Sequence, residues 1–394
     1  RDKVPEGVVG ARGLRDLAVR LGLGRVHHVG ELDPVLDEED GDVVADEVPV
    51  ALLGVELRRE ATDVAREVGD DAADTAGLLA AVAAAFAELA TGDLHIPITE
   101  VVRAVFGADT ENAEIVTQWR APRVVLALVL GILLGISGAI FQTLTRNPLG
   151  SPDIIGFNTG AYTGALVVLL VLDGVATSYY PTAIGALIGG IVTALLVYLL
   201  AFKRGVQGFR LIIVGIATSA VLAAVNTWLI LKADLEDAMS AAVWGAGTLN
   251  NKEWVHAQPV LIVAVILVIP VFWVAYRMPM LDMGDDAAAA LGIRVERTRL
   301  AMIVVGVSLT AIATAAAGPI SFVALAAPQL ARRLTRSAGV TVIASAAMGA
   351  LVLVVSDWIA QFAFGDKDLP VGVVTVSIGG LYLVWLLALE ARRQ

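Results

Sequence analysis

The 394-residue chain contains no cysteine, and none of its four histidines lies inside a long apolar run. The missing cysteines exclude disulfide bonds, iron–sulfur clusters and thiol chemistry. No pair of histidines has the spacing of zinc ligands, so the sequence predicts no metal site. The chain also lacks a G-x-x-x-x-G-K-[ST] P-loop, which excludes nucleotide binding of that kind. We therefore expect no catalytic residue and no cofactor bound by this chain.

Charged residues are scarce, at 17% of the chain, whereas hydrophobic residues make up 57%. Soluble domains are about 45–50% apolar and about 25% charged. Apolar runs of about 20 residues recur, and each can cross a hydrocarbon core of about 30 Å. The runs do not alternate polar and apolar residues as the strands of a membrane β-barrel do. The sequence predicts an all-α polytopic protein with about ten transmembrane helices in a lipid bilayer, and no nucleic-acid partner.

Residues 1–77 differ from the rest of the chain and contain no Ser, Asn, Gln, Ile, Met, Phe, Tyr or Trp. The net charge of −11 belongs entirely to residues 1–91, which hold 20 acidic and 9 basic residues. Without aromatic residues or Ile, this segment has little with which to build a dense core. We expect an acidic, low-complexity extension that is not a selected domain, from a mis-assigned start or a frame error. A disordered cytoplasmic tail is the alternative, and the membrane domain is expected over residues 78–394.

The predicted spans follow the apolar runs. The first, at 76–90, is short and interrupted by Glu88. The others are 122–144, 154–172, 181–202, 211–231, 260–276, 300–317, 320–334, 341–364 and 371–389. One set of connections between them carries thirteen lysines and arginines and the other set carries six. The positive-inside rule then places both termini in the cytoplasm of a multi-pass inner or plasma membrane protein.

The most informative stretch is 137–161, SGAIFQTLTRNPLGSPDIIGFNTGA, which interrupts two apolar helices with polar residues, glycines and prolines. We interpret it as a sharp cytoplasmic return between closely packed spans. Its motif residues are Ser137, Gly138, Gln142, Arg146, Asn147, Pro148, Pro152, Gly156, Asn158 and Gly160. The sequence G-I-S-G that ends at Gly138 matches the G-x-S-G of intramembrane serine proteases. A serine nucleophile needs a general base, and no histidine lies at membrane depth, so we interpret Ser137 as a packing residue.

A short polar segment at 284–293, GDDAAAALGI, lies in a predicted cytoplasmic connection. Asp285 can cap a short helix, Asp286 lies in its first turn, and Gly292 can end it. Two interpretations remain open. The segment is either a linker helix or a helix presented to a partner.

Two further features carry charge near the spans. Asp357 lies inside the ninth predicted span, where an acid is either a functional group or a buried partner of another polar residue such as Asn226 or Gln142. Arg120 and Arg123 stand three residues apart at the outer end of the second span. They are either interfacial anchors or a docking pair for acidic groups on an external protein.

Five motifs together resemble the FecCD family of ABC importer permeases, which take up ferric siderophores, haem and cobalamin. They are WRAPR at 119–123, the stretch 137–161, GDDAAAALGI at 284–293, AGPISFVALAAPQLARRL at 317–334 and LPVGVVTVSIGG at 369–380. The resemblance covers residue 88 to the end and implies the type II ABC importer permease fold. Within the family, the stretches 157–164, 209–216 and 226–238 are most similar to the G-type permease of ferric enterobactin importers. That similarity implies a catecholate or similar ferric siderophore.

The resemblance also implies partners and site residues. The partners would be a second, paralogous permease in a heterodimer, two ATPase subunits that use the ATP, and a periplasmic or lipid-anchored siderophore-binding protein. Residues 284–292 would form the coupling helix that fits the ATPase, with Gly284, Asp285, Asp286, Ala287, Leu291 and Gly292 as its site residues. Arg120 and Arg123 would meet acidic residues of the binding protein. A further family arginine is here Gln361, for which Lys367 could substitute.

The sequence thus predicts a permease subunit that moves a ferric siderophore across the cytoplasmic membrane by alternating access. It is not itself an enzyme, because ATP hydrolysis belongs to another chain. The rival interpretation is a stand-alone secondary transporter of a small solute. Such a protein is expected to have internal repeats and ion-coupling acids at the membrane midplane, and here only Asp357 qualifies.

Overall fold

The computed structural model describes residues 74–92, 94–153, 155–172, 179–202, 208–335, 339, 341–363 and 369–391. These residues form helices joined by turns and short connections, and no β-strand occurs among them. Most of the predicted N-terminal extension lies outside the described residues, so its nature stays a prediction.

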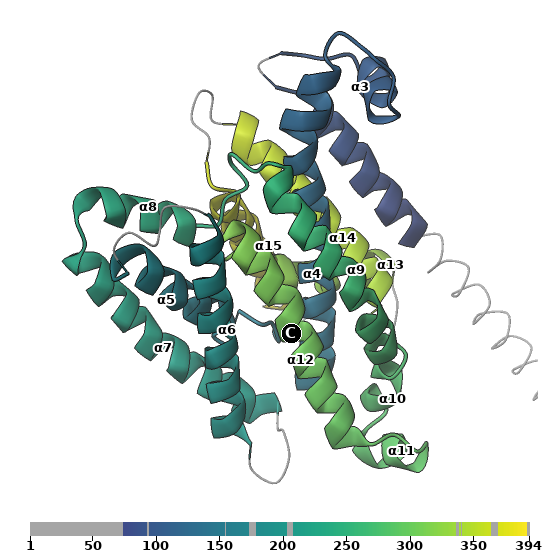
Figure 1. Cartoon of the computed structure of the whole chain (residues 1–394). Helices are drawn as coiled ribbons and strands as arrows, with labels where there is room; N and C mark the ends of the chain where they lie inside the picture. The colour runs from purple at the N-terminus through teal and green to yellow at the C-terminus, as the bar shows by residue number, and fades with distance from the viewer. Residues whose placement is uncertain are drawn as a thin grey trace, which may run out of the picture. The chain divides into compact units, whose positions relative to one another are not determined.

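The chain forms a first helix at 74–90 and then a series of labelled helices (Figure 1). In order these are α3 Ile98–Val105, η1 Ile115–Arg120, α4 Ala121–Thr145, α5 Phe157–Leu170, α6 Tyr179–Ala201, α7 Gly208–Lys232, α8 Leu235–Gly245, α9 Trp254–Ala275, α10 Met278–Asp282, α11 Asp285–Ala290, α12 Val295–Ala317, α13 Val323–Thr335, α14 Val342–Phe362 and α15 Val371–Ala391. Each of the ten predicted spans overlaps one of these helices. The short helices α3, α8 and α10 were not predicted.

Six of the described helical segments are long and apolar enough to cross a membrane. They are Ile115–Thr145, Tyr179–Ala201, Gly208–Lys232, Trp254–Asp282, Val295–Ala317 and Val342–Phe362. The segments Phe157–Leu170 and Val371–Trp385 are apolar but shorter. The prediction of an all-α polytopic membrane protein is confirmed.

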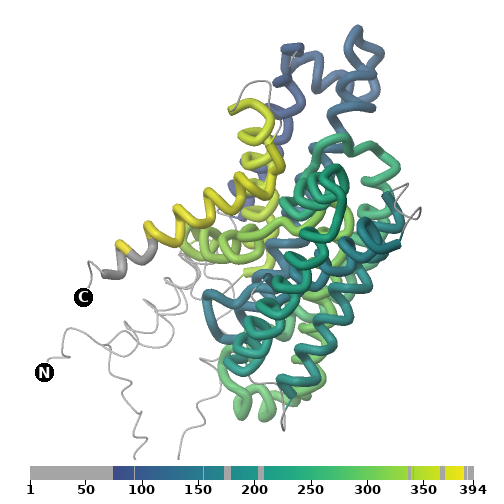
Figure 2. The backbone as a smooth tube through the Cα atoms, turned by 90° about the vertical axis from the view of Figure 1, so that its left-hand side faces the viewer, coloured from purple at the N-terminus to yellow at the C-terminus, as the bar shows by residue number. Residues whose placement is uncertain are grey.

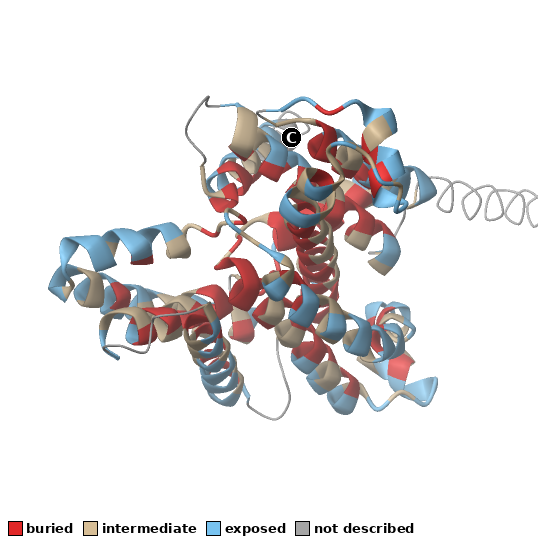
Figure 3. Cartoon of the chain, turned by 45° about the horizontal axis from the view of Figure 1, so that its top comes forward, coloured by how far each residue is buried: buried red, intermediate tan, exposed pale blue. Residues whose placement is uncertain are grey.

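Helix α4 lies at the centre of the unit formed by residues 70–394 and packs against α14, α12, α13 and α9. Its buried residues point in every direction around the helix, because apolar side chains fill all of its faces. Figure 3 shows this burial as red ribbon concentrated in the middle of the bundle. By contrast, α7 has a mostly exposed apolar surface, with residues such as Phe209 and Leu231 more than three-quarters exposed.

Glycines allow α4 and α14 to pack with their backbones in contact. A Cβ atom added to Gly131 would collide with the carbonyl group of Gly349, and one added to Gly135 would collide with the carbonyl of Ser345. These glycines of α4 therefore form a packing surface, since close approach of helix backbones requires small residues.

A second group of helices is built from α5, α6, α7 and α8, and α12 contacts both α5 and α6 of this group (Figure 1). Glycines again form the contact, because Gly164 of α5 lies against Gly185 and Gly189 of α6. Figure 2 shows α15 along one side of the bundle, where it contacts α14 and α13. We name the two ends of the bundle the α3 end and the α11 end, at the top and bottom of Figure 1.

Candidate functional sites

Helix α11 forms a short, defined element at its own end of the bundle. The helix begins after Gly284, which occupies the cap position with φ +107°, so the prediction that Asp285 caps the helix is wrong. Its other end confirms the predicted role of Gly292, which adopts φ +84° after the last turn. The amides of Gly292 and Ile293 donate to the carbonyls of Ala289 and Ala288, which is the Schellman arrangement.

Asp285 instead ties α11 to two long helices. Its carboxylate accepts a hydrogen bond of 2.6 Å from Arg146, the residue that ends α4. It also accepts bonds of 2.8 and 2.9 Å from Arg299 of α12. Arg146 adopts the left-handed conformation (φ 49°) and donates a second bond of 3.0 Å to the carbonyl of Leu281. One carboxylate therefore connects α4, α11 and α12.

The outer surface of α11 remains free to meet a partner. Asp286 and Leu291 are exposed, and Leu291 is 60% exposed although it is apolar. Ala287 is half-buried and Ala288 is fully buried beneath the helix. A rigidly held helix with a small, exposed surface is suited to a protein–protein contact.

The first part of the stretch 137–161 lies inside the bundle and packs against distant helices. The hydroxyl of Ser137 is completely buried and lies 2.8 Å from both the carbonyl of Gly306 and the hydroxyl of Thr310. Gly138 has no room for a Cβ atom, because the carbonyl of Ala324 occupies that space. Ser137 is thus hydrogen-bonded in the α4–α12 contact, as expected of a packing residue.

Gln142 joins α4 to α13. Its amide nitrogen donates to the carbonyl of Leu325 at 3.0 Å, and its oxygen accepts from Gln329 at 2.6 Å. Gln329 also donates to the carbonyl of Pro148 at 3.1 Å. The pair of glutamines therefore holds the return after α4 against α13.

The return itself is a series of turns. The side-chain oxygen of Asn147 accepts from the amide of Leu149 at 2.9 Å, and Pro152 is buried with its carbonyl near the amide of Phe157. Gly156 adopts φ +89° at the start of α5, which an L side chain would resist. Gly160 faces Thr193 of α6 without space for a side chain. The prediction of a tight, closely packed return is borne out by these contacts.

Asn158 is part of a buried polar group that the sequence did not reveal. Its amide nitrogen donates to Asp153 at 2.5 Å, and its oxygen accepts from Thr314 of α12 at 3.1 Å. The other oxygen of Asp153 accepts from the amide of Phe322 at 3.3 Å. Phe322 has φ +70°, so Asp153 holds the connection between α12 and α13 in an unusual backbone conformation.

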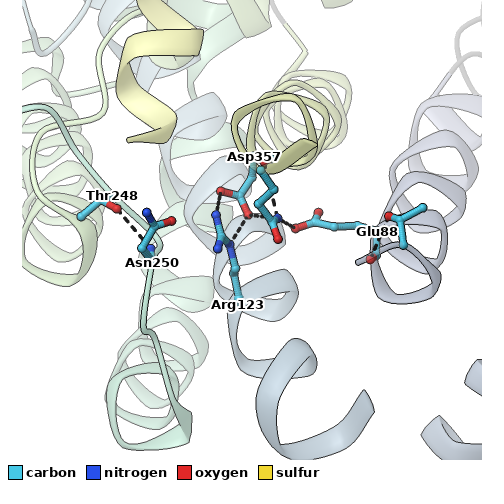
Figure 4. A network of polar contacts seen from close by, with 7 residues as sticks. Glu88, Arg123, Thr248, Asn250 and Asp357 are labelled. Carbon is cyan, nitrogen blue, oxygen red and sulfur yellow. Dashed lines mark hydrogen bonds and ion pairs between the residues drawn. The ribbon is translucent and has the colours of Figure 1, made fainter. Parts of the chain in front are cut away.

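At the α3 end, Arg123 and Asp357 form a buried ion pair (Figure 4). The guanidinium donates to both carboxylate oxygens, at 2.7 and 2.9 Å, and Asp357 is fully buried. Gln361 donates to Asp357 at 3.1 Å and to Glu88 at 2.9 Å. The expected partners Asn226 and Gln142 are wrong, because Asp357 pairs with Arg123 and Gln361. Arg123 supplies the counter-charge of Asp357, which supports the interpretation of this acid as a buried partner of another polar residue.

Arg120 lies in η1, a π-helical turn, and points back toward the first helix. Its guanidinium donates to the carbonyls of Leu89 and Leu94 at 2.8 and 2.7 Å. The two predicted docking arginines therefore both have intramolecular partners, and neither is fully exposed. Lys367 lies outside the described residues. Docking through these residues stays a prediction.

A cavity of about 490 Å³ lies beside η1, lined among others by Trp119, Lys252 and Trp254. The ammonium of Lys252 lies 4.8 Å from the ring centre of Tyr179, a cation–π distance. Burial lowers the pKa of Lys252 to about 8, because desolvation disfavours its charged form. The indole of Trp254 donates to the carbonyl of Thr117 at 2.9 Å and fixes one wall of the cavity.

Several residues of these sites were not identified from the sequence, because a single polar residue produces no periodic pattern. Asp153 lies 169 positions from Phe322, Arg299 pairs with Asp285 across the turn between two helices, and Glu88 was noted only as an interruption. Within the described ranges, no three His, Asp or Glu side chains gather in a way that could hold a metal ion.

Comparison of the sequence with known proteins identifies one family. The sequence model of the FecCD transport family matches residues 79–388, which is most of the chain. The chain belongs to the FecCD transport family. One FecCD relative is FepG of Escherichia coli (strain K12), the ferric enterobactin transport system permease protein. The two sequences are 49% identical over 316 residues, which cover 80% of this chain and 95% of FepG. The probable siderophore transport system permease protein YfhA of Bacillus subtilis (strain 168) is 37% identical, covering 79% of this chain and 92% of YfhA.

A solved structure described as an inward-facing conformation of a metal-chelate type ABC transporter has the same fold. It is 25% identical, has a TM-score of 0.67, and the match covers 80% of this chain and 98% of that chain. The resemblance inferred from the motifs is therefore confirmed. This FecCD protein is a multi-pass membrane transport protein and not an enzyme.

Proposed function

We propose that this FecCD protein is the permease subunit of an ATP-binding cassette importer that moves a ferric siderophore across the cytoplasmic membrane. A catecholate-like chelate is the favoured cargo, because FepG is named for ferric enterobactin and is 49% identical to this chain. The importer works by alternating access, in which the passage opens to one side of the membrane at a time.

The observation that carries the proposal is the attachment of α11 through Asp285. A force applied to a loosely tethered helix would be lost in its connections. Here Arg146 and Arg299 join the first residue of α11 to α4 and α12, which lie in the body of the bundle. Movement of α11 is therefore transmitted to the helices that line the centre of the protein.

The partners follow from this arrangement. We place the α11 end in the cytoplasm, where α11 is the coupling helix for one of two ATPase subunits. The exposed apolar surface of α7 is suited to a second, paralogous permease or to lipid. At the α3 end, a periplasmic or lipid-anchored binding protein delivers the chelate, and Arg120 is the predicted docking arginine that is not part of the ion pair with Asp357.

The coupling role is tested by replacing Gly284 and Asp286 with bulky residues, as in Gly284→Trp with Asp286→Trp. Neither position is enclosed, since an added Cβ at Gly284 meets nothing within 4 Å and Asp286 is exposed. Gly284 has φ +107°, which strains any residue other than glycine, so Gly284→Ala and Asp286→Trp are also made singly to separate backbone strain from obstruction. The protein should therefore still insert, while the uptake of ⁵⁵Fe-labelled ferric enterobactin should fall at least about tenfold because the ATPase contact is obstructed. Uptake at the unaltered rate would disprove the coupling assignment.

A second measurement separates the importer from a secondary transporter. Uptake is measured in membranes that contain the whole assembly, once with the ATPase intact and once with its catalytic glutamate replaced. An importer stops when ATP hydrolysis stops. Uptake that continues with the inactive ATPase would identify ion-driven transport instead.

A further inference from the structure

A second cavity, of about 350 Å³, lies between α5 and α7. Its walls include Asn158, Thr159 and Tyr162 from α5 and Asn226 and Thr227 from α7. Gly245, Pro319 and Ser321 complete the lining where α8 ends and where α12 passes into α13. No lysine, arginine, aspartate or glutamate is among its lining residues, so the cavity is polar but uncharged.

Asn226 lines this cavity and carries a hydrogen-bond acceptor without a partner. The residue is only 4% exposed, and its amide nitrogen lies 3.4 Å from the carbonyl of Thr159. A backbone carbonyl can only accept, so the nitrogen must face Thr159 and the oxygen must point elsewhere. That side-chain oxygen is buried and has no partner among the described residues. A buried polar atom without a partner inside an apolar span is costly and indicates function by default.

Three neighbouring polar side chains already have hydrogen-bond partners within the protein. Asn158 donates to Asp153 and accepts from Thr314. The hydroxyl of Tyr162 donates to the carbonyl of Ala241 at 3.1 Å, and that of Thr227 donates to the carbonyl of Ala223 at 2.9 Å. Among the residues that line the cavity, Asn226 is the one whose side chain has a buried polar atom without a partner, its amide oxygen. A ligand that fits this chemistry presents N–H or O–H donors.

The shape of the cavity suits part of a chelate. Its volume lies at the lower end of the range for small-molecule pockets. Tyr162, whose ring stacks on Trp244 at 6.1 Å between centres, provides a flat wall. Thr227 and Ala223 are exposed on α7, so the cavity can be reached from the surface of the chain.

We propose that this cavity is a substrate-contact site, in which Asn226 accepts a hydrogen bond from an uncharged N–H or O–H group on the periphery of the chelate during transport. The proposal rests on the proposed function as a siderophore importer. A single neutral acceptor gives selectivity without tight binding, and a site on a transport route must release what it holds. The stretches 157–164 and 226–238 both contribute to this wall, which joins two separate parts of the sequence in one specificity site.

The test compares two chelates in proteoliposomes that contain the full assembly, with loaded binding protein at saturation. The probes are ferric enterobactin, which carries amide N–H groups, and its N-methylated amide analogue, which lacks them. The variants are Asn226→Ala, which removes the acceptor, and Asn226→Asp, which retains one. Ser219→Ala is the matched control, because Ser219 lies on the same helix, donates only to the carbonyl of Gly215 and does not line the cavity.

We expect Asn226→Ala to lower uptake of ferric enterobactin about three- to tenfold, the value of one neutral hydrogen bond. The N-methylated analogue should be transported slowly by the unaltered protein, and Asn226→Ala should not change its rate. Asn226→Asp should retain the preference for the amide-bearing chelate, and Ser219→Ala should match the unaltered protein. ATP hydrolysis stimulated by the binding protein should be the same in every case.

Two results would overturn the proposal. Equal uptake of the two chelates by the unaltered protein would show that no donor of the chelate is recognised, whatever the variants do. An equal loss for both chelates in Asn226→Ala would show that Asn226 only supports the fold. If the unaltered assembly transports neither chelate, the siderophore function itself fails, which is a different outcome from either of these.

Discussion

Arg146 and Asp285 lie 139 positions apart in the sequence, yet the guanidinium of the first donates a 2.6 Å hydrogen bond to the carboxylate of the second. The contact joins the end of α4 to the first residue of α11. Both side chains are nearly half exposed, at 47% and 44%. A pair so exposed contributes about 0–1 kcal/mol to stability, so its value lies in positioning rather than in holding the fold together.

The first prediction concerns Asp285. Asp285→Ala removes the acceptor for both Arg146 and Arg299, so α11 should lose its attachment to α4 and α12. We expect uptake to fall severalfold while the melting temperature in detergent changes by only about 2–4 °C, because the contact with Arg146 is exposed and the contact with Arg299 is only partly buried. Glu296→Ala is the matched control, since Glu296 also pairs with Arg299 but at 3.4 Å and away from α11. Equal uptake by the two variants would remove the positioning role.

The second prediction concerns the buried pair at the α3 end. Arg123→Leu leaves the fully buried carboxylate of Asp357 without its cation, and Asp357→Leu leaves the guanidinium without its anion. Each single change should destabilise the protein by about 3–5 kcal/mol. The double change removes both charges and should cost distinctly less than either single change. Thermal unfolding of the three variants in one detergent checks this, and additive losses would contradict it.

The third prediction separates docking from folding at the same end. A change of Arg123 would disturb the buried pair, so Arg120→Glu is the informative variant. Arg120→Ala loses the same hydrogen bonds to Leu89 and Leu94 without reversing the charge, and it therefore measures the structural share of the effect. It should weaken association with the binding protein about tenfold, a loss of about 1.4 kcal/mol, because an attractive charge becomes repulsive. Arg103→Glu is the control, since Arg103 is an exposed residue of α3 near the same end. A dissociation constant in nanodiscs that is the same for both variants would exclude Arg120 as a docking residue.

The fourth prediction follows from Lys252, whose pKa burial lowers to about 8. The unfolded chain keeps this lysine protonated up to about pH 10.4, so between pH 8 and that value the unfolded state binds more protons. Stability should then rise with pH across this window. Lys252→Met should flatten that part of the stability profile, measured by thermal unfolding from pH 7 to 10. If stability rises with pH as steeply in the variant as in the unaltered protein, another titratable group causes the rise.

Membrane helices were predictable because each depends on local composition. An apolar run of about 20 residues must form a helix in lipid, since only a helix satisfies the backbone within one segment. The close helix contacts at Gly131, Gly185 and Gly189 follow an equally local rule, because small residues at helical spacing permit close packing. The end of α11 at Gly292 was also correct, whereas its start was misplaced by one residue, since Gly284 rather than Asp285 takes the cap position.

The pairing of polar side chains could not be predicted from the sequence. Asp357 was recognised as significant, but its partner Arg123 lies 234 positions away and was assigned to docking instead. Asn226 was named only as a partner for Asp357, and the structure places it in a separate cavity. Composition and spacing describe what a residue is and which helix carries it, but not which face of another helix it meets.

The sequence by itself determined the membrane location, the helical class, the approximate spans and, through its motifs, the FecCD family. These properties depend on the transfer of local segments into lipid and on short contiguous patterns. Only the tertiary structure decided that Asp285 connects three helices, that Asp357 is neutralised, and that Asn226 has an oxygen without a partner. Hydrogen bonds act over about 3 Å, and only the folded chain brings groups from distant positions within that range.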